Sequence, residues 1–583
     1  MKKILVISLI ASGIMIGIMA AALVFSPKGN TVDKAGLDLV TGTLETEPIN
    51  VDGSSHYTIG KNGEIRSFSH NKGDIYNVRK SKQISDKLDK LKKQTHYTFE
   101  KPLFVWNPYG TNQLSLYYYF RDEESTYVKY TIQVDDPAIP AFTRTLSNHT
   151  EHNLTRTHEY LLTGFVPGYQ NYLVIRKYNR SGKLLMKEYY DFFVDKLTDS
   201  VKTKLSYTDG KSSNQISEGL YCVCGYHAGE KDTKDLIPFY DNSGVIRTAI
   251  PVLDYRTDRM ELVQDSMVYS YSSQALAKVS ALGQVMKVYK LGKYRLCGDF
   301  IYNGYGQLWC LATMSGSQST KDRVVSVDMK TGEVTEMVDF GILFPKMKAK
   351  ALKAVSRKPV NWIGLNSIDR IGSSDILVSS GELSSIMKIK SVTSGYPKIG
   401  YIISDRSIWK KSNYKKYLLL KGAYVKKKWY NLDGGTETQE EGVHNFTCQF
   451  GQNSVISHLG NNLDEEQYYV TMLNNNYGYS EAYPAVNWSK TASTGTKGKP
   501  AGNSRYYEYL VDEKAGYYGL KKSYDLPYTQ QGGSVYWNGT NTIVNSMGNK
   551  TFGEYDQNGK LIREYALKAY RIYKYDMKNI WYY

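Results

Sequence analysis

The chain has 583 residues, of which 22% are charged and 41% hydrophobic. This balance excludes a disordered chain, and the length exceeds one ordinary domain, so we expect a small module and a large one. The formal charge of +17 raises the question of nucleic-acid binding. We do not predict it, because the Lys and Arg residues are spread along the chain without a stripe of interleaved aromatics; a basic surface near an anionic membrane or cell wall is favoured.

Tyrosine is unusually abundant, with 52 Tyr against 16 Phe. A tyrosine ring packs on a sheet while its hydroxyl stays in water, which favours a large all-β protein. The five cysteines are an odd and sparse set that predicts neither a disulfide framework nor a metal motif. Cys222 and Cys224 would share one face of a strand. We therefore expect no metal and no cofactor.

The N-terminus carries an uninterrupted apolar run from Ile4 to Phe25 behind Lys2 and Lys3. In a helix that rises about 1.5 Å per residue, this run crosses a hydrocarbon core of about 30 Å. The two lysines predict a cytoplasmic N-terminus and an exported body. We expect residues 1–26 to be a transmembrane signal-anchor that holds the protein in the cell membrane. Cleavage after the small residues around Ala21, which would secrete the body, is the alternative.

Residues 27–96 predict a polar, loosely structured stalk that ends in a short helix. From Asn77 to about Gln94 the sequence is rich in lysine, and Ile84, Leu88 and Leu91 recur at helical spacing. This spacing places the three apolar side chains on one stripe, which we expect to pack on the domain that follows.

Residues 97–200 alternate between apolar and polar side chains in short runs separated by turn residues. Asn179-Arg180-Ser181-Gly182 predicts a hairpin turn between two such runs. A β-sandwich is the expected fold of this segment.

Residues 201–583 contain a looser repeat, in which a short strand reaches a glycine-closed turn and an alternating strand leaves it. The turn glycines are Gly244, Gly283, Gly332 and Gly559. The spacing of the first three is close to the repeat of a four-stranded propeller blade, and the segment length favours six blades. We expect the propeller to close by pairing a strand around Ala569–Tyr575 with the first strands of the domain.

Several segments resemble, in the right order, the PAPS-independent aryl-sulfate sulfotransferase (arylsulfotransferase) family. They are NPYGTNQLSLYYYF at Asn107–Phe120, VNWIGLNSIDRIGSSDILVSSGELSSIMKIK at Val360–Lys390, KIGYIISD at Lys398–Asp405, GVHNFTCQF at Gly442–Phe450 and NSRYYEYLVD at Asn503–Asp512. The resemblance implies a sandwich followed by a propeller. It also implies sulfuryl transfer from a phenolic sulfate ester to a phenol through a histidine, without a nucleotide donor.

The resemblance places the nucleophilic histidine of a Gln-His motif on His444, which Val443 precedes here. The family's two further histidines and its arginine fall on Gly298, Gly364 and Gly381. Asn366, Ser367 and Asp299 are the expected substrate-binding residues beside these positions. The other histidines are interpreted as surface or structural residues.

Two functions remain open at this point. The first is weak sulfuryl transfer through His444, and the second is an inactive propeller that binds a ligand or a cell-surface partner. The expected partner is a small aromatic sulfate, a phenol or an unidentified ligand. The sequence leaves open whether the protein forms a homodimer.

Overall fold

The computed structural model describes residues 56–59, 63–197, 201–226, 236–253, 255–433, 440–490, 492–497 and 499–583. The predicted signal-anchor lies outside these residues. Within the described ranges, no helix has both the length and the apolar character needed to cross a membrane.

The N-terminal domain is a β-sandwich, as predicted for residues 97–200. Its long strand β4 runs through both layers: Ser115–Arg121 pairs with β3 and β6, and Tyr127–Gln133 pairs with β7. Gly182, in the predicted hairpin turn between β7 and β8, has a φ of 80° and donates its N–H to Asn179 O at 3.0 Å. The strands are β1 (His56–Ile59), β2 (Gly63–Ser67), β3 (Leu103–Trp106), β4 (Ser115–Gln133), β5 (Phe142–Thr145), β6 (Thr155–Thr163), β7 (Tyr169–Tyr178) and β8 (Leu184–Val194).

The described part of the predicted stalk is more ordered than expected. Strand β2 pairs in parallel with β3, and Ile65 is buried, so this segment extends the sandwich sheet. The predicted helix is α2 (Val78–Gln94), which follows the short η2 (Lys72–Asp74). Asn77 caps α2 by accepting the Arg79 and Lys80 N–H groups at 3.0 and 3.2 Å.

Helix α2 packs on both domains, which confirms the predicted apolar stripe. Leu88 is buried, and Ile84 and Leu91 pack against the same hydrophobic core. Ser81 Oγ accepts the backbone N–H of Val285 in the propeller at 2.9 Å. The helix therefore joins the sandwich to the second blade.

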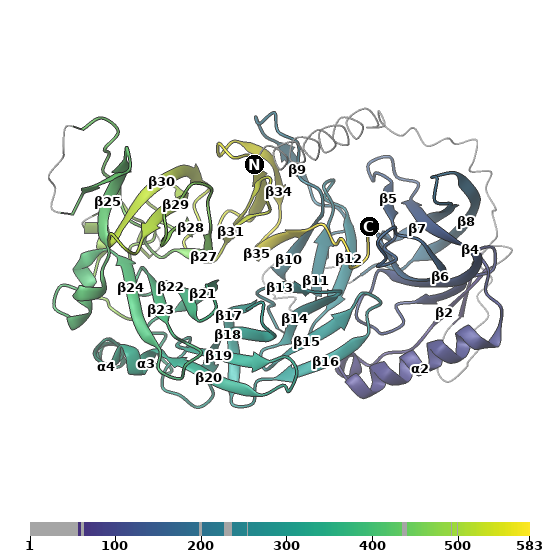
Figure 1. Cartoon of the computed structure of the whole chain (residues 1–583), viewed down its shortest axis with the longest axis horizontal. Helices are drawn as coiled ribbons and strands as arrows, with labels where there is room; N and C mark the ends of the chain where they lie inside the picture. The colour runs from purple at the N-terminus through teal and green to yellow at the C-terminus, as the bar shows by residue number, and fades with distance from the viewer. Residues whose placement is uncertain are drawn as a thin grey trace, which may run out of the picture. The chain divides into compact units, whose positions relative to one another are not determined.

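The propeller has six blades (Figure 1). Blade 1 contains β10 (Leu220–Tyr226), β11 (Leu236–Tyr240), β12 (Ile246–Pro251) and β35 (Ala569–Tyr575). Blade 2 contains β13 (Met260–Val263), β14 (Ser266–Ser272), β15 (Ala275–Ser280) and β16 (Val285–Lys290). Blade 3 contains β17 (Tyr294–Tyr302), β18 (Gln307–Met314), β19 (Arg323–Asp328) and β20 (Val334–Asp339).

Blade 4 contains β21 (Leu365–Ile371), β22 (Asp375–Ser380), β23 (Ser385–Lys390) and β24 (Lys398–Ser404). Blade 5 contains β27 (Asn453–His458), β28 (Gln467–Asn474), β29 (Ser504–Asp512) and β30 (Tyr517–Leu526), with β25 (Leu420–Val425) and β26 (Lys428–Asn431) at its outer edge. Blade 6 contains β31 (Ser534–Trp537), β32 (Thr542–Ser546), β33 (Thr551–Tyr555), β34 (Leu561–Ala566) and β9 (Tyr207–Asp209). Short helices in the connections are α3 (Phe340–Leu343), α4 (Pro345–Ala354), η3 (Arg406–Ile408), η4 (Asn413–Tyr417) and η5 (Trp488–Lys490).

Both ends of the propeller sequence close the ring. The C-terminal strand β35 pairs with β10 and forms the inner edge of blade 1, which confirms the predicted closure. Strand β9, from the start of the domain, pairs with β34 at the outer edge of blade 6. After β35 the chain returns to the sandwich, where the Tyr583 N–H donates to Thr145 O at 3.0 Å. The C-terminus therefore holds together both the ring and the junction with the sandwich.

The inner strands β13, β17, β21, β27, β31 and β35 follow one another around the axis, each in contact with the next from β13 to β35. Cys222 and Cys224 lie on β10 with their Sγ atoms 3.9 Å apart, so they share one face as predicted, and both thiols are free. The inner strands bring residues from distant parts of the chain to the axis.

Candidate functional site

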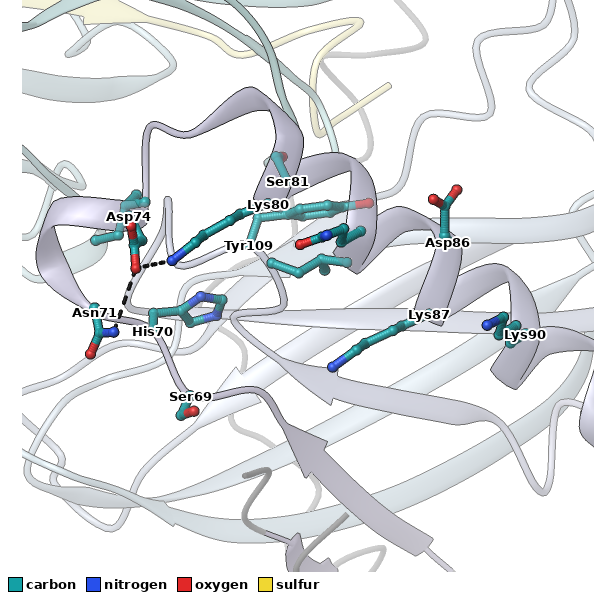
Figure 2. A pocket seen from close by; sticks show the side chains of 13 residues that line it. Ser69, His70, Asn71, Asp74, Lys80, Ser81, Asp86, Lys87, Lys90 and Tyr109 are labelled. Atoms are coloured by element: carbon teal, nitrogen blue, oxygen red, sulfur yellow. Dashed lines mark hydrogen bonds and ion pairs between the residues drawn. The ribbon is translucent and has the colours of Figure 1, made fainter. Parts of the chain in front are cut away.

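One hollow lies between α2 and the segment that precedes it (Figure 2). Its volume is about 570 Å³. Lys80 and Asn71 both reach Asp74, and the His70 ring nitrogen lies 3.2 Å from Asn107 O. Because these polar groups hydrogen-bond or pair with one another, we interpret this hollow as structural rather than as a ligand site.

A second hollow of about 260 Å³ lies at the end of the inner strands, near the propeller axis. Its polar and aromatic lining consists of Arg256, Lys321, Glu382, Asn361, Asn366, Asn453, Gln530, Gln531, Tyr477, Tyr479 and Tyr570. Asn366 lies on β21, Asn453 on β27 and Tyr570 on β35. Three blades therefore contribute inner-strand residues to one small polar pocket, which we call the axial pocket.

A buried ion pair lies beside the axial pocket and contacts two of its lining residues. The Arg571 guanidinium lies 3.0 Å from Asp299 Oδ1, with side-chain exposures of 1% and 0%. Arg571 also donates to Asn453 Oδ1 at 3.1 Å and to the carbonyl of Asn366. Arg259 lies 3.1 Å from the same Asp299 oxygen. Asp299, an expected substrate ligand, thus holds the inner strands together and is absent from the pocket lining.

The two cations of the axial pocket differ in their surroundings. Arg256 donates to Asp258 Oδ1 at 3.0 Å, and its guanidinium lies 3.4 Å from the Tyr570 ring centre. Lys321 forms no ion pair with any described residue. Burial raises the pKa of the Glu382 carboxyl, while its hydrogen bonds to Ser480 and Ala482 and the nearby Lys321 charge oppose the rise. The Lys321 ammonium is therefore the positive charge most available to a ligand.

The structure brings together the three glycines that the sequence identified. Gly364 and Gly381 line the axial pocket, and a Cβ added to Gly298 would lie 3.4 Å from Asn366 Cα. Gly298 and Gly364 have φ angles of +108° and +62°, in the region that disfavours side chains, and Gly381 does not. Ser367 Oγ accepts the Val455 N–H at 2.9 Å and joins two inner strands.

His444 is not brought into the axial pocket. Its side chain is exposed in the loop before β27. The Lys421 ammonium of β25 donates to Asn445 Oδ1 at 2.8 Å and to Phe446 O at 3.0 Å, so this loop lies beside the outer edge of blade 5. A histidine there is separated from Asn366, Gly364 and Gly381 by the width of the blade.

The residue that blade 5 presents to the axial pocket is Asn453, at the start of β27. Gln452 precedes it and donates to Ser379 Oγ at 3.0 Å and to Ser385 O at 2.9 Å. Gln452 lies directly before the inner strand of blade 5, and Asn453, the first residue of that strand, lines the axial pocket. Asn453 was not among the residues predicted from the sequence, because no local pattern marks the residue that opens an inner strand.

The remaining described histidines lie away from the axial pocket lining. His158, in the sandwich, stacks on Phe120 with ring centres 4.1 Å apart, and burial lowers its pKa to about 4. His458 lies 3.9 Å from Glu508. His227 lies outside the described residues.

An axial pocket in a six-bladed propeller that follows an immunoglobulin-like sandwich defines a two-domain class of β-propeller protein. The family model described as arylsulfotransferase (ASST) matches residues 206–579, and the arylsulfotransferase Ig-like domain matches residues 103–192. The chain belongs to the arylsulfotransferase family, a family of sulfotransferases. This confirms the resemblance found in the sequence.

No curated protein matches the chain. Among solved structures, a streptogramin B lyase is 12% identical over 63% of this chain and 88% of its own, with a TM-score of 0.30. A functionally unknown protein from Desulfotomaculum acetoxidans is 12% identical over 61% and 98%, with a TM-score of 0.33. A periplasmic gluconolactonase of Pseudomonas aeruginosa is 10% identical over 77% and 99%, with a TM-score of 0.30. Similarities at this level say nothing about function.

Proposed function

We propose that the axial pocket binds a small aromatic monoanion, of which an aryl sulfate is the best candidate, and transfers its sulfuryl group slowly or not at all. One observation carries this proposal. The described lining residues include two cations, several amides and three tyrosines but no histidine. Such a lining suits binding better than covalent transfer.

The chemistry of the lining explains the distinction. Sulfuryl transfer without a nucleotide needs a nucleophile that holds the group while donor and acceptor exchange. An Asn453 amide does not serve as that nucleophile. Lys321 and the amide donors would still bind sulfonate oxygens, and the tyrosine rings would contact an aryl group.

Loss of the family's clamp would slow any remaining reaction. Gly stands at positions 298, 364 and 381, so two imidazoles and a guanidinium are missing. One missing donor of this kind costs about 2.7–4 kcal/mol of transition-state stabilisation. Sulfuryl transfer through His444 is the second candidate, and family membership alone favours it.

Binding and turnover of 4-nitrophenyl sulfate test the proposal directly. Calorimetry should show saturable binding that Lys321→Ala weakens, while the release of 4-nitrophenolate to a phenol acceptor stays close to the uncatalysed rate. His444→Ala is the matched control and should leave binding unchanged. Absence of saturable binding would refute the pocket assignment. Robust turnover that His444→Ala abolishes would establish the enzyme instead.

Gly381→Arg sharpens this test, because it returns one cation to the axial pocket. The φ angle at Gly381 permits a side chain, but its added Cβ would lie 3.3 Å from Asn366 Nδ2, which donates to Gln452 O at 2.9 Å and would have to shift slightly. A charge-assisted hydrogen bond contributes about 1.5–3 kcal/mol, so affinity should rise about tenfold or more. Histidine at Gly298 or Gly364 meets unfavourable φ angles, and restoring all three residues at once would strain the site.

We also propose that the body lies outside the cytoplasmic membrane, anchored through Ile4–Phe25. The apolar run and the preceding lysines support this placement. Protease added to intact cells should then digest the body. A body protected until the cells are lysed would contradict the proposal.

A further inference from the structure

Blade 5 carries an insertion between β24 and β27 that contains η3, η4, β25 and β26. Figure 1 shows β25 at the edge of this blade. Seven exposed lysines, which we call the lysine rim, lie between η3 and the end of η4 or at the β25–β26 turn and the start of β26. They are Lys410, Lys411, Lys415, Lys416, Lys426, Lys427 and Lys428. Sequence analysis treated the basic residues as evenly spread, but here they are concentrated.

The lysine rim has few acidic partners. Lys426 lies 3.2 Å from Glu440, and with exposures of 73% and 38% this pair is weak. The other six lysines form no ion pair with described residues. Two carboxylates of the insertion have other partners: Asp433 pairs with Arg406 at 2.6 Å, and Asp405 caps η3. Six of the seven rim lysines are therefore exposed without an ion-pair partner among the described residues.

The insertion is attached to the rest of the propeller by Trp429, Tyr414 and strand β25. Trp429 stacks on Tyr517 with ring centres 5.2 Å apart and donates its indole N–H to Asp512 Oδ2 at 2.9 Å. Strand β25 pairs in parallel with β30 of the blade. Tyr414 packs against Phe344, with ring centres 4.9 Å apart. The lysines are thus displayed on an anchored platform.

The backbone at the β25–β26 turn is strained. Lys426 and Lys427 have φ angles of +49° and +62°, in the left-handed region. Two-residue hairpin turns of this type normally use Asn-Gly, because the left-handed region disfavours residues with a larger side chain. Backbone strain of this kind is often found at functional sites.

We propose that the lysine rim binds a linear polyanion that carries phosphate groups. A lysine ammonium is a compact positive charge that donates hydrogen bonds to a phosphate group in many orientations. Such a group suits a flexible, linear ligand. No residue among 405–433 has an exposed large hydrophobic side chain, so the rim lacks groups that would insert into a bilayer or stack on nucleobases. Charge complementarity therefore favours a polymer without bases over a membrane or a nucleic acid.

Fluorescently labelled inorganic polyphosphate and the purified full-length chain test this proposal. A variant with Gln at all seven rim lysines should bind at least about tenfold more weakly and show a shallower dependence on salt. The matched control removes the same charge elsewhere, by Gln at Lys82, Lys87, Lys90, Lys93, Lys183, Lys187 and Lys560, all exposed. The control should change affinity by about twofold or less.

The outcomes separate the explanations. Equal losses in both variants would show that net charge alone acts and would overturn the proposal. Rim-dependent binding to phosphatidylglycerol vesicles without binding to polyphosphate would assign the rim to a membrane surface instead. Circular dichroism must show that both variants melt like the parent chain. Binding of 4-nitrophenyl sulfate should be unchanged in the rim variant, so this test is independent of the axial pocket.

Discussion

Charged side chains are buried and paired at the propeller axis, whereas most of the lysines at the outer edge of blade 5 are exposed and have no ion-pair partner among the described residues. At the axis, Arg571 and Arg259 share Asp299 among buried inner strands. At the edge, six of the seven rim lysines meet no carboxylate among the described residues. Burying a charge is costly unless a partner compensates it, whereas an exposed charge is solvated at little cost. Charge at the axis therefore belongs to the fold, and charge at the edge is free to bind a partner.

The axial pocket lies between these extremes. The paired Arg571 donates to two of its lining residues, Asn366 and Asn453, whereas Lys321 in its wall has no ion-pair partner among the described residues. Two positions at which the resemblance predicted a family histidine or arginine, Gly364 and Gly381, line this pocket as glycine. A propeller keeps its ring when these residues change, because the inner strands are joined by buried contacts beneath the pocket. The residues that line the pocket can therefore change without loss of the closed ring.

The largest effect is expected from removing the C-terminal strand. Deletion of residues 570–583 removes most of β35 together with Arg571, which opens blade 1 and exposes β10. Cooperative thermal unfolding, followed by circular dichroism, should be lost. A truncated chain that melts at the temperature of the full-length protein would contradict the double closure.

A single substitution at the axis should have the next largest effect. Arg571→Met leaves Asp299 buried with less compensation and should lower the free energy of unfolding by about 3–5 kcal/mol. Lys427→Met at the rim is the matched control and should not lower it, because Lys427 is exposed and makes no ion pair with described residues. Urea denaturation measures both. Equal losses would remove the distinction between axis and edge.

A carboxyl group on an inner strand, Glu261, should also make the free energy of unfolding depend on pH. Burial raises the pKa of Glu261 to about 7; Arg259 opposes the rise, and Asp299 and Asp369 add to it. Between the ordinary carboxyl pKa and 7, the folded chain holds a proton on Glu261 that the unfolded chain has lost. The stabilisation is therefore full below this window and decreases as the pH rises through it.

Urea midpoints measured across this window for the parent chain and for Glu261→Gln test the assignment. The substitution should flatten the dependence, since glutamine does not titrate. Identical slopes would place the titrating group elsewhere.

The smallest effect is expected at the β25–β26 turn. Lys426→Asn with Lys427→Gly relieves two left-handed lysines and should raise the free energy of unfolding by about 1–2 kcal/mol. Affinity for polyphosphate should fall, because two rim charges are lost. A less stable variant would show that the two lysine side chains stabilise the turn, and would contradict the interpretation that the backbone there is strained.

Much of the architecture could be predicted from local patterns. Asn77 and the stripe through Leu88 predicted α2, because capping and helical spacing act within a few turns. The alternating runs and Gly182 predicted the sandwich hairpin for the same reason. The short strand β2 (Gly63–Ser67) was missed, since its pairing with β3 depends on a partner far along the chain.

The candidate site could be predicted only in part. Gly364, Gly381 and Asn366 follow a recognisable motif, and the structure places all three in the axial pocket. His444 follows a motif match too, yet β25 and the loop before β27 place it at the outer edge of the blade. An insertion shifts which residue opens an inner strand, and sequence spacing does not reveal that shift.

The sequence by itself determined the fold class, the turn positions and the family, because each depends on residue identity or on short-range periodicity. Only the tertiary structure decided that Asn453 faces the axial pocket, that Asp299 pairs with Arg571, and that the lysines of the blade 5 insertion are exposed. These features join residues from separate blades or from both sides of a hairpin. Their physical basis is burial and pairing across the fold, which residue order alone does not specify.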